Sequence, residues 1–243
     1  MDVHDDGWFG DSVAPDYDDD VAERFAPDAL GPEVEFLADL AAGQPALEFA
    51  IGTGRVALPL AERGIAVSGI ELSEAMVREL RAKPGGADIP VTIGDMATTR
   101  IDGGFGLVYL VFNTIMNLLT QDEQVACFEN AAAHLSPGGA FVVEVIVPQI
   151  RRLPPGVRFA PFHVAGDHVG IDEYDLVTQR SWSHHLRPDR PWARMPFRYV
   201  WPSELDLMAR VAGMRLTERW ADWHRSTFTA ESTSHVSVWR TQR

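Results

Sequence analysis

The stretch of sequence that decides the fold is Leu47-Glu48-Phe49-Ala50-Ile51-Gly52-Thr53-Gly54-Arg55. A short apolar run passes directly into a glycine-x-glycine turn, and a helical pattern follows. Glycine lets the backbone turn tightly and lets a ligand approach main-chain N–H groups without interference from a Cβ atom. The stretch therefore predicts a strand that ends at a ligand-binding loop.

The chain around this stretch alternates between short apolar runs and helical segments. Runs rich in Val and Ile with little polar alternation are typical of parallel strands that are covered on both faces. Ser73 is a candidate helix cap, and Thr120 with Glu123 forms a capping-box pattern. The alternation predicts an α/β fold, a Rossmann-like doubly wound and mostly parallel sheet with an antiparallel last strand. The expected parallel strands are residues 46–50, 66–70, 91–93, 107–111 and 140–145, and the last strand is 235–239.

The pattern changes after residue 150. Residues 172–186 and 195–201 each alternate between apolar and polar positions, which predicts one antiparallel strand apiece, with a turn at 187–191 between them. A helix from 203 to 212 follows. The predicted organisation is an N-terminal arm and helix (1–44), a ligand-binding α/β core (45–150), a small antiparallel β insert that forms a substrate lid (151–201), and a C-terminal helix and strand that complete the core (202–243).

Two carboxylates follow predicted strands and suit an adenosine-containing ligand. Glu71 comes just after the second strand, where a carboxylate accepts hydrogen bonds from ribose hydroxyls. Asp95 ends the third strand, where it can accept the adenine amino group. The glycine loop alone also fits a dinucleotide fingerprint, so it does not separate NAD from S-adenosylmethionine. Glu48 inside the first strand, the long segment before the loop and Asp95 favour S-adenosylmethionine.

The loop resembles motif I of the class I S-adenosylmethionine-dependent methyltransferases, and Glu71, Asp95-Met96 and residues 111–114 resemble the motifs that follow it. A weaker similarity extends to the amino-sugar N,N-dimethyltransferases, which share an acidic, tyrosine-containing arm (here Asp16-Tyr17-Asp18) and an antiparallel insert. The first glycine usual in the family is Ala50 here.

The resemblance implies S-adenosylmethionine as the cofactor, with roles for particular residues. Gly52 and Gly54 would face the methionine moiety, with Tyr17 and Arg55 closing over it and Asn113 beneath it. The full expected cofactor-binding set is Tyr17, Glu48, Ala50, Gly52, Gly54, Arg55, Glu71, Leu72, Met76, Asp95, Met96, Phe112 and Asn113.

The catalytic candidates are Tyr17, Asn117, His163 and His184. Asn117 occupies the position after strand four where some members of the subgroup have a histidine. A histidine can accept a proton near neutral pH, which suits a general base. However, His184 shares an apolar face with Trp182 and Leu186, which is typical of a packed core residue. No cysteine or carboxylate cluster accompanies the histidines, so no metal is expected.

The predicted function is an S-adenosylmethionine-dependent methyltransferase that N- or O-methylates a small molecule, a secondary metabolite, by in-line transfer. Two alternatives stay open. One is a nicotinamide-dependent oxidoreductase, which the single lysine, Lys83, disfavours because it allows no Tyr-x-x-x-Lys pair. The other is a non-catalytic module that binds an adenosine ligand. The acceptor, the atom that is methylated and the identity of any base stay open.

Charge and composition limit the partners. The 243 residues carry a net charge of −14, which disfavours nucleic acid, and no apolar run reaches the roughly 18 residues of a membrane span. The lone Cys127 fits a cytoplasmic location. Residues 1–23 hold nine acids and no base, whereas 151–198 hold eight arginines and five acids. The acceptor is therefore expected to be neutral or anionic, and an exposed edge of the insert would allow a homodimer. The arginines available to hold a carboxylate or phosphate are Arg151, Arg152, Arg180 and Arg198.

Overall fold

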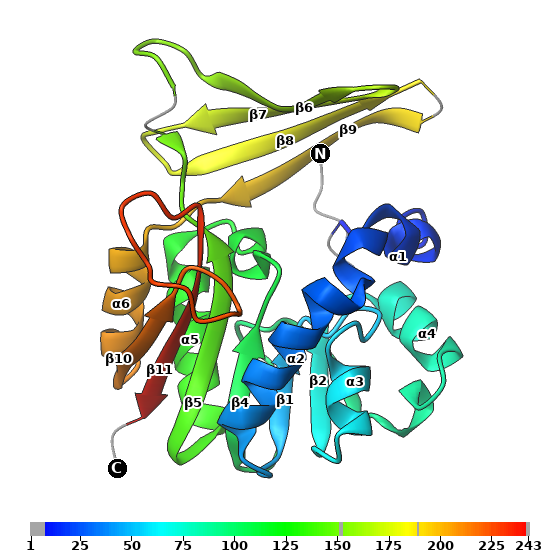
Figure 1. The fold of residues 1–243 in the computed structure, drawn as a ribbon, viewed down its shortest axis with the longest axis vertical. Helices are drawn as coiled ribbons and strands as arrows, with labels where there is room; N and C mark the ends of the chain where they lie inside the picture. Colours follow the sequence, from blue (N-terminus) through cyan, green and yellow to red (C-terminus); the bar gives the residue numbers. More distant parts are fainter. Residues whose placement is uncertain (1–7, 151–152, 189, 242–243) are drawn as a thin grey trace.

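A computed structural model describes residues 8–150, 153–188 and 190–241, and within them a large sheet forms the centre of the molecule (Figure 1). Its strands are β1 (Ala46–Phe49), β2 (Val67–Glu71), β3 (Val91–Ile93), β4 (Phe105–Leu110), β5 (Leu135–Ile146), β10 (Met214–Trp220) and β11 (Ser234–Thr241). Their order is β10-β11-β5-β4-β1-β2-β3. The first five pair in parallel, and β11 pairs antiparallel with both β5 and β10. The predicted fold class is confirmed.

Helices cover both faces of this sheet because its buried strands alternate between two cores. Val108 and Leu110 of β4 pack in one core with Phe128, whereas Leu107 and Tyr109 pack in the other. The helices are α2 (Pro27–Ala41), α3 (Ala57–Glu62), α4 (Glu74–Ala82), α5 (Gln121–His134) and α6 (Pro202–Val211). Residues of α5 and α6 lie in the first core, and residues of α2 and α3 lie in the second.

Local signals fix the starts of two of these helices. The Ser73 hydroxyl accepts the N–H of Met76 at 3.2 Å at the start of α4. Thr120 and Glu123 form both hydrogen bonds of a capping box at the start of α5. Both predicted caps are confirmed.

The insert forms a second sheet, which lies across the end of the central sheet (Figure 1). Its antiparallel strands are β6 (Phe159–Ala165), β7 (His168–Asp175), β8 (Arg180–Arg187) and β9 (Arg190–Arg198). The prediction of a single strand over 172–186 is wrong, because a turn at 176–179 divides it into β7 and β8. Leu176 and Val177, which continued the apolar pattern, are exposed in this turn. The turn expected at 187–191 joins β8 to β9, and its residue 189 lies outside the described residues.

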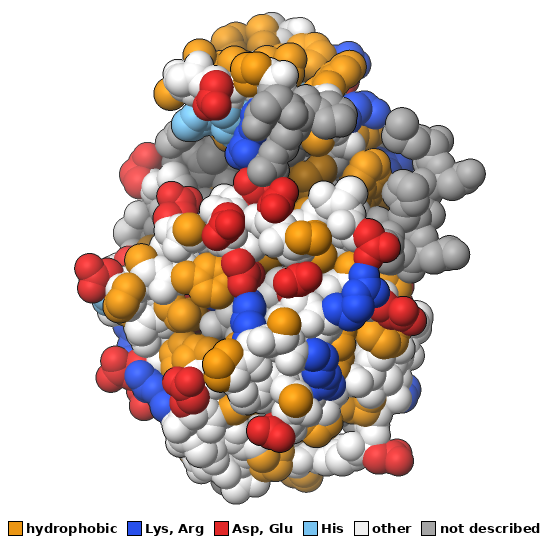
Figure 2. All heavy atoms as spheres, turned by 90° about the vertical axis from the view of Figure 1, so that its right-hand side faces the viewer, with side chains coloured by type: hydrophobic (Ala, Val, Ile, Leu, Met, Phe, Trp, Pro, Cys, Tyr) orange, Lys and Arg blue, Asp and Glu red, His pale blue; other side chains and the backbone are white. Residues whose placement is uncertain are grey.

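Two strands escaped the sequence pattern altogether. β6 has apolar residues at both odd and even positions, and in β10 the alternation of Met214, Leu216 and Trp220 is interrupted at Glu218, where the register with β11 shifts. Figure 2 shows hydrophobic side chains gathered over the top of the molecule, where the insert lies. β6 itself exposes Phe159, Phe162 and Val164.

The N-terminal arm is a chain of short helical turns beside the insert (Figure 1). These are η1 (Ala14–Asp16), α1 (Tyr17–Asp20) and η2 (Ala22–Phe25), and they lead into α2. The arm packs on α4 through η1. The arm and the insert therefore meet above the edge of the sheet where the parallel strands end.

None of the described helices is long and apolar enough to cross a lipid bilayer.

Candidate functional site

In the glycine loop after β1, every second residue from 50 to 54 has a backbone in the left-handed region. Ala50, Gly52 and Gly54 have φ values of 52°, 56° and 81°. At Gly54 a Cβ would lie 2.3 Å from Cδ1 of Leu80, so a side chain would collide with α4. At Gly52 the nearest atoms would be 3.9 Å away, an ordinary van der Waals contact without collision, and Gly52 lines a cavity beside the loop. The two glycines thus serve different purposes, since Gly54 allows close packing and Gly52 leaves room for a ligand.

The carboxylate of Glu71 binds the loop to the start of α4. Its Oε2 accepts the Gly52 N–H at 2.8 Å, and its Oε1 accepts the Ser73 N–H at 2.9 Å. Burial raises the pKa of the Glu71 carboxyl, and the two backbone donors oppose that rise. This carboxylate sits at the end of β2, where it can also accept the hydroxyl protons of a ribose.

A cavity of about 260 Å³ opens beside the loop, and residues of the arm and the insert line it as well. It brings together nine residues that the sequence predicted: Tyr17, Ala50, Gly52, Glu71, Leu72, Met76, Asp95, Met96 and Asn117. It adds eleven that the sequence did not predict: Trp8, Phe9, Ile70, Gly94, Thr114, Leu118, Leu119, Glu123, Met195, Pro196 and Phe197. Residues of the arm, the ends of β1, β2 and β3, the loop after β4 and the insert therefore line one cavity.

The arm supplies aromatic walls to this cavity. Phe9 and Tyr17 meet edge to face, with ring centroids 5.8 Å apart. The Ser73 hydroxyl donates to the carbonyl of Phe9 at 2.7 Å, which holds the start of the arm on α4. Burial raises the pKa of Tyr17 to about 12, so its phenol stays protonated at neutral pH. Tyr17 can therefore donate a hydrogen bond into the cavity but is poorly suited to act as a base.

A buried polar network supports the loop from behind. Arg55 makes two hydrogen bonds to the Glu33 carboxylate, at 2.7 and 3.0 Å. Glu48 accepts the hydroxyl of Tyr109 at 2.9 Å, and burial raises the pKa of Glu48 to about 8. Glu48, Gly54 and Arg55 were predicted to bind the cofactor, but they are not among the residues that line the cavity. Their contacts in the structure are with the protein beneath the loop.

The turn after β4 is backbone-strained and tied to β5. Phe112 and Asn113 have φ values of 59° and 63°, which side-chain-bearing residues rarely adopt. The Phe112 N–H donates to Glu144 at 2.7 Å, and the Asn113 side-chain oxygen accepts the N–H of Ile146 at 2.7 Å. Neither Phe112 nor Asn113 lines the cavity. The strained turn instead directs the next residues, including Asn117, toward it.

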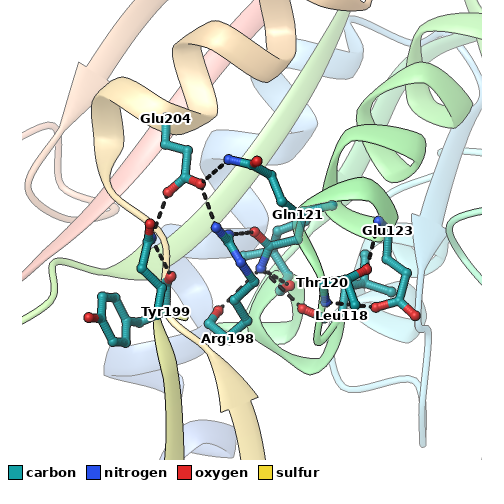
Figure 3. Close-up of polar contacts among 10 residues, drawn as sticks. Leu118, Thr120, Gln121, Glu123, Arg198, Tyr199 and Glu204 are labelled. Atoms are coloured by element: carbon teal, nitrogen blue, oxygen red, sulfur yellow. Dashed lines mark hydrogen bonds and ion pairs between the residues drawn. The ribbon is translucent and has the colours of Figure 1, made fainter. Parts of the chain in front are cut away.

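The insert reaches the cavity through the end of β9, which carries Met195, Pro196 and Phe197. Just beyond, Arg198 is buried and forms an ion pair with Glu204 of α6 at 2.6 Å (Figure 3). The buried Gln124 side chain donates to the carbonyls of Arg198 and Leu118, both at 3.2 Å. This network fixes the insert to α5 and α6, and it occupies the Arg198 guanidinium that the sequence had offered to an acceptor.

The two histidines predicted as catalytic lie elsewhere in the insert. His184 is 3.2 Å from the Glu173 carboxylate and stacks on Trp192. His163 stacks on His168, with ring centroids 4.7 Å apart. Neither lines the cavity. Their predicted role as a base therefore gains no support from their positions.

Three other insert arginines were expected to hold an acceptor, and the structure describes one of them. The Arg180 guanidinium lies over the ring of Trp182, 5.7 Å from its centroid. Arg151 and Arg152 lie outside the described residues. Over residues 8–150, 153–188 and 190–241, no group of three or more His, Cys, Asp or Glu side chains is arranged to hold a metal ion.

The missed cavity residues had weak signals in the sequence. Trp8 and Phe9 stood out as aromatics within an acidic arm, and Met195 and Phe197 as alternate residues of one strand face. Those patterns indicate burial, but they do not say against what a residue is buried. The partner surfaces are set by tertiary packing of the arm and the insert over the loop.

Known proteins match this arrangement over most of the chain. A family model described as a methyltransferase domain matches residues 46–139. The solved CcbJ methyltransferase from Streptomyces caelestis is 39% identical, covers 87% of this chain and 89% of its own, and superposes with a TM-score of 0.77. The cypemycin N-terminal methyltransferase of a Streptomyces species is 25% identical over 81% of this chain and 82% of its own.

A third relative matches a shorter region. It is the dTDP-3-amino-3,4,6-trideoxy-alpha-D-glucopyranose N,N-dimethyltransferase of Streptomyces venezuelae, 34% identical over 40% of each chain. With the glycine loop and the cavity, these matches confirm the predicted enzyme class and its cofactor. The chain belongs to the class I S-adenosylmethionine-dependent methyltransferases.

Proposed function

We propose that the enzyme N-methylates a small amine whose body is largely apolar. The observation that carries this proposal is the lining of the cavity. The lining residues that come from the insert, Met195, Pro196 and Phe197, are apolar, and the charged lining residues, among those described, are all carboxylates. This combination suits an organic cation that loses a proton before it reacts.

The cavity divides naturally between cofactor and acceptor. Glu71 and Asp95 mark the part for the ribose and adenine, and Gly52, which also lines the cavity, marks the part for the methionine end. Ligand sites combine apolar walls with a few polar groups that fix orientation. The remaining lining matches that description for an acceptor, with apolar walls formed by Leu118, Leu119, Met195 and Phe197 and polar groups from Thr114, Asn117 and Glu123.

The charge of the acceptor follows from the same lining. The charged lining residues in the described chain are Glu71, Asp95 and Glu123, and none is basic. Because Glu71 and Asp95 are assigned to the cofactor, Glu123 is the carboxylate left for the acceptor. The expectation of a neutral or anionic acceptor relied on four insert arginines, of which Arg198 is paired with Glu204 and Arg180 lies over the Trp182 ring. We therefore favour an acceptor that is neutral when it reacts and cationic in solution.

The chemistry needs little from the protein beyond placement. Bound S-adenosylmethionine supplies the methyl group and a sulfide leaving group. The walls of the cavity hold the amine nitrogen in line with the methyl carbon and exclude water, which together supply several kcal/mol of the rate enhancement. An amine that has lost its proton to solvent before it binds would present its lone pair to the methyl carbon, and the new C–N bond would replace the C–S bond of the cofactor. A hydroxyl acceptor would need a base, and Tyr17 with its raised pKa does not supply one.

The names of two relatives agree with nitrogen as the nucleophile. One methylates an N-terminus, and another is an N,N-dimethyltransferase of an amino sugar. Both relatives act on amines by name. Because their acceptors differ, we infer the acceptor of this enzyme from the apolar walls of its own cavity.

The test is a panel of acceptors with S-adenosylmethionine that carries a deuterated methyl group. The panel pairs apolar amines with alcohols and carboxylic acids of the same carbon skeleton, and mass spectrometry locates the label. The proposal predicts label on nitrogen. Label on oxygen, or transfer to the carboxylic acids at the rate of the amines, would contradict it. Binding of S-adenosylhomocysteine with no transfer to any acceptor would favour the non-catalytic module.

The proposal includes a homodimer and a cytoplasmic location. β6 is the free edge of the insert sheet and exposes Phe162 and Val164, and such edges readily pair with another chain. The free, buried Cys127 suits a reducing compartment. Light scattering tests the dimer, with Val164→Lys as the edge variant. A monomeric mass for the unchanged protein would refute it.

A further inference from the structure

Lys83 is the single lysine of a chain that has 21 basic residues, and it lies directly after α4. Its ammonium donates to the carbonyl of Thr53 at 2.8 Å and forms an ion pair with Asp18. It also lies 5.4 Å from the centroid of the Phe25 ring. One cation thus joins the glycine loop to two turns of the N-terminal arm.

Asp18 is the shared partner in this contact. Its Oδ1 accepts the hydroxyl of Thr53 at 2.6 Å, and its Oδ2 faces Lys83. Thr53 is buried, and the Lys83 side chain is 25% exposed. Each of the three residues therefore contacts the other two, in a setting that is partly screened from water. Such an ion pair is worth more than one on an open surface.

The position of Asp18 sets the position of its neighbour Tyr17. Both belong to the single turn of α1, so fixing one side chain on the loop limits where the other can lie. Tyr17 lines the cavity, and Thr53 lies between the two glycines of the loop. The contact therefore sets the arm against the part of the loop that faces the methionine end of the cofactor.

We propose that Lys83 is a positioning residue for methyl transfer, because its contacts with Asp18 and Thr53 hold the arm and Tyr17 over the bound cofactor. The turnover part of this inference rests on the proposed function, whereas the cofactor-release part does not. The use of lysine in an arginine-rich chain fits this role. An ammonium can divide its three donors among a carbonyl, a carboxylate and a ring face, whereas the planar guanidinium favours a two-pronged contact with one carboxylate.

The matched control lies on the same helix and the same arm. Arg78 of α4 forms an ion pair with Asp11, and both side chains are exposed. This pair joins α4 to the arm without touching the glycine loop. Arg78→Met therefore removes an arm contact of the same kind but leaves the loop contact in place.

The experiment compares Lys83→Met, Lys83→Arg, Asp18→Asn, the double variant that combines Lys83→Met with Asp18→Asn, and Arg78→Met. Stopped-flow displacement measures the dissociation rate of S-adenosylhomocysteine, and turnover is measured with an amine acceptor. Lys83→Met and Asp18→Asn should each speed dissociation and lower kcat by about tenfold, and the double variant should add little to either. Lys83→Arg should recover part of both losses, and Arg78→Met should stay within about twofold of the unchanged enzyme.

Two outcomes would overturn the proposal. One is an unchanged dissociation rate in both Lys83→Met and Asp18→Asn. The other is an equal loss in Arg78→Met, which would mean that any arm contact matters. If Lys83→Met does not fold, Asp18→Asn removes the same ion pair from the arm side. Faster dissociation with no methyl transfer by any variant, including the unchanged enzyme, would support the Lys83 contact while refuting the proposed function.

Discussion

The Glu71 carboxylate accepts a hydrogen bond from the Gly52 backbone N–H at 2.8 Å. The two residues lie 19 positions apart, and parallel pairing of β1 and β2 brings them to the same edge of the sheet. The sequence motif and its distant acid are therefore one structural unit. A loop that presents backbone N–H groups beside a carboxylate can meet both the methionine end and the ribose of the cofactor.

Glu71→Gln should weaken the binding of S-adenosylhomocysteine by about tenfold. The carboxylate accepts two backbone N–H groups, whereas a glutamine side chain has one oxygen and would turn its NH₂ toward one of these donors. Titration calorimetry measures the dissociation constant. Glu74→Gln, an exposed change on the next helix, is the control. Equal affinity in the Glu71 and Glu74 variants would show that Glu71 does not hold the ribose.

Gly52→Arg should abolish cofactor binding because the new side chain fills the space beside the loop. Gly43→Arg introduces the same side chain at a glycine with φ 78° and open surroundings, at the end of α2. Both variants strain the backbone, but only the first intrudes on the cavity. The expected result is loss of binding for Gly52→Arg and near-normal binding for Gly43→Arg. Normal binding by folded Gly52→Arg would place the cofactor elsewhere.

Phe197→Ala should raise KM for the amine acceptor by about tenfold and leave the affinity for S-adenosylhomocysteine unchanged. Phe197 belongs to the insert end of the cavity and to the half proposed for the acceptor. Steady-state kinetics and calorimetry measure the two quantities on the same preparation. Loss of cofactor affinity with an unchanged KM would mean that the two halves of the cavity are assigned the wrong way round.

The stability of the protein should fall with rising pH through the titration of Glu48. Burial raises its pKa from 4.5 to about 8, so the folded protein keeps a proton that the unfolded chain releases. This stabilisation is fully present below pH 4.5 and is lost as pH rises toward 8. Glu48→Gln stays neutral and should remove that loss, which is on the order of a few kcal/mol.

Urea unfolding at pH 5 and pH 8 measures this effect. The unchanged protein should lose more unfolding free energy between the two pH values than Glu48→Gln does. Glu62→Gln, on the exposed side of α3, should follow the unchanged protein. Parallel pH dependence in all three proteins would show that Glu48 is ionised in the folded state at neutral pH.

Predictions from sequence succeeded where the chemistry is local. Gly52, Glu71 and Asp95 each follow a strand, and strand ends in a parallel sheet meet at one edge, so their meeting could be inferred from the pattern. The helix caps at Ser73 and Thr120 depend on residues three positions away and were equally predictable.

The acceptor side could not be predicted in the same way. The turn at 176–179 interrupts an apolar alternation that looks continuous in the sequence. Arg198 reads as a free cation, but its partner Glu204 lies on the helix that follows the insert. The sequence pattern indicates that Phe197 and Phe9 are buried, but it does not show which surface covers them. Each of these depends on how separate segments pack together.

A crystal structure with S-adenosylhomocysteine bound would show whether the cavity under the arm and the insert holds the cofactor. We expect ribose hydroxyls within hydrogen-bonding distance of Glu71, adenine beside Asp95, and the sulfur facing the space between Tyr17 and Phe197. Adenosine bound outside this cavity, or bound with its sulfur turned away from the insert, would contradict this expectation.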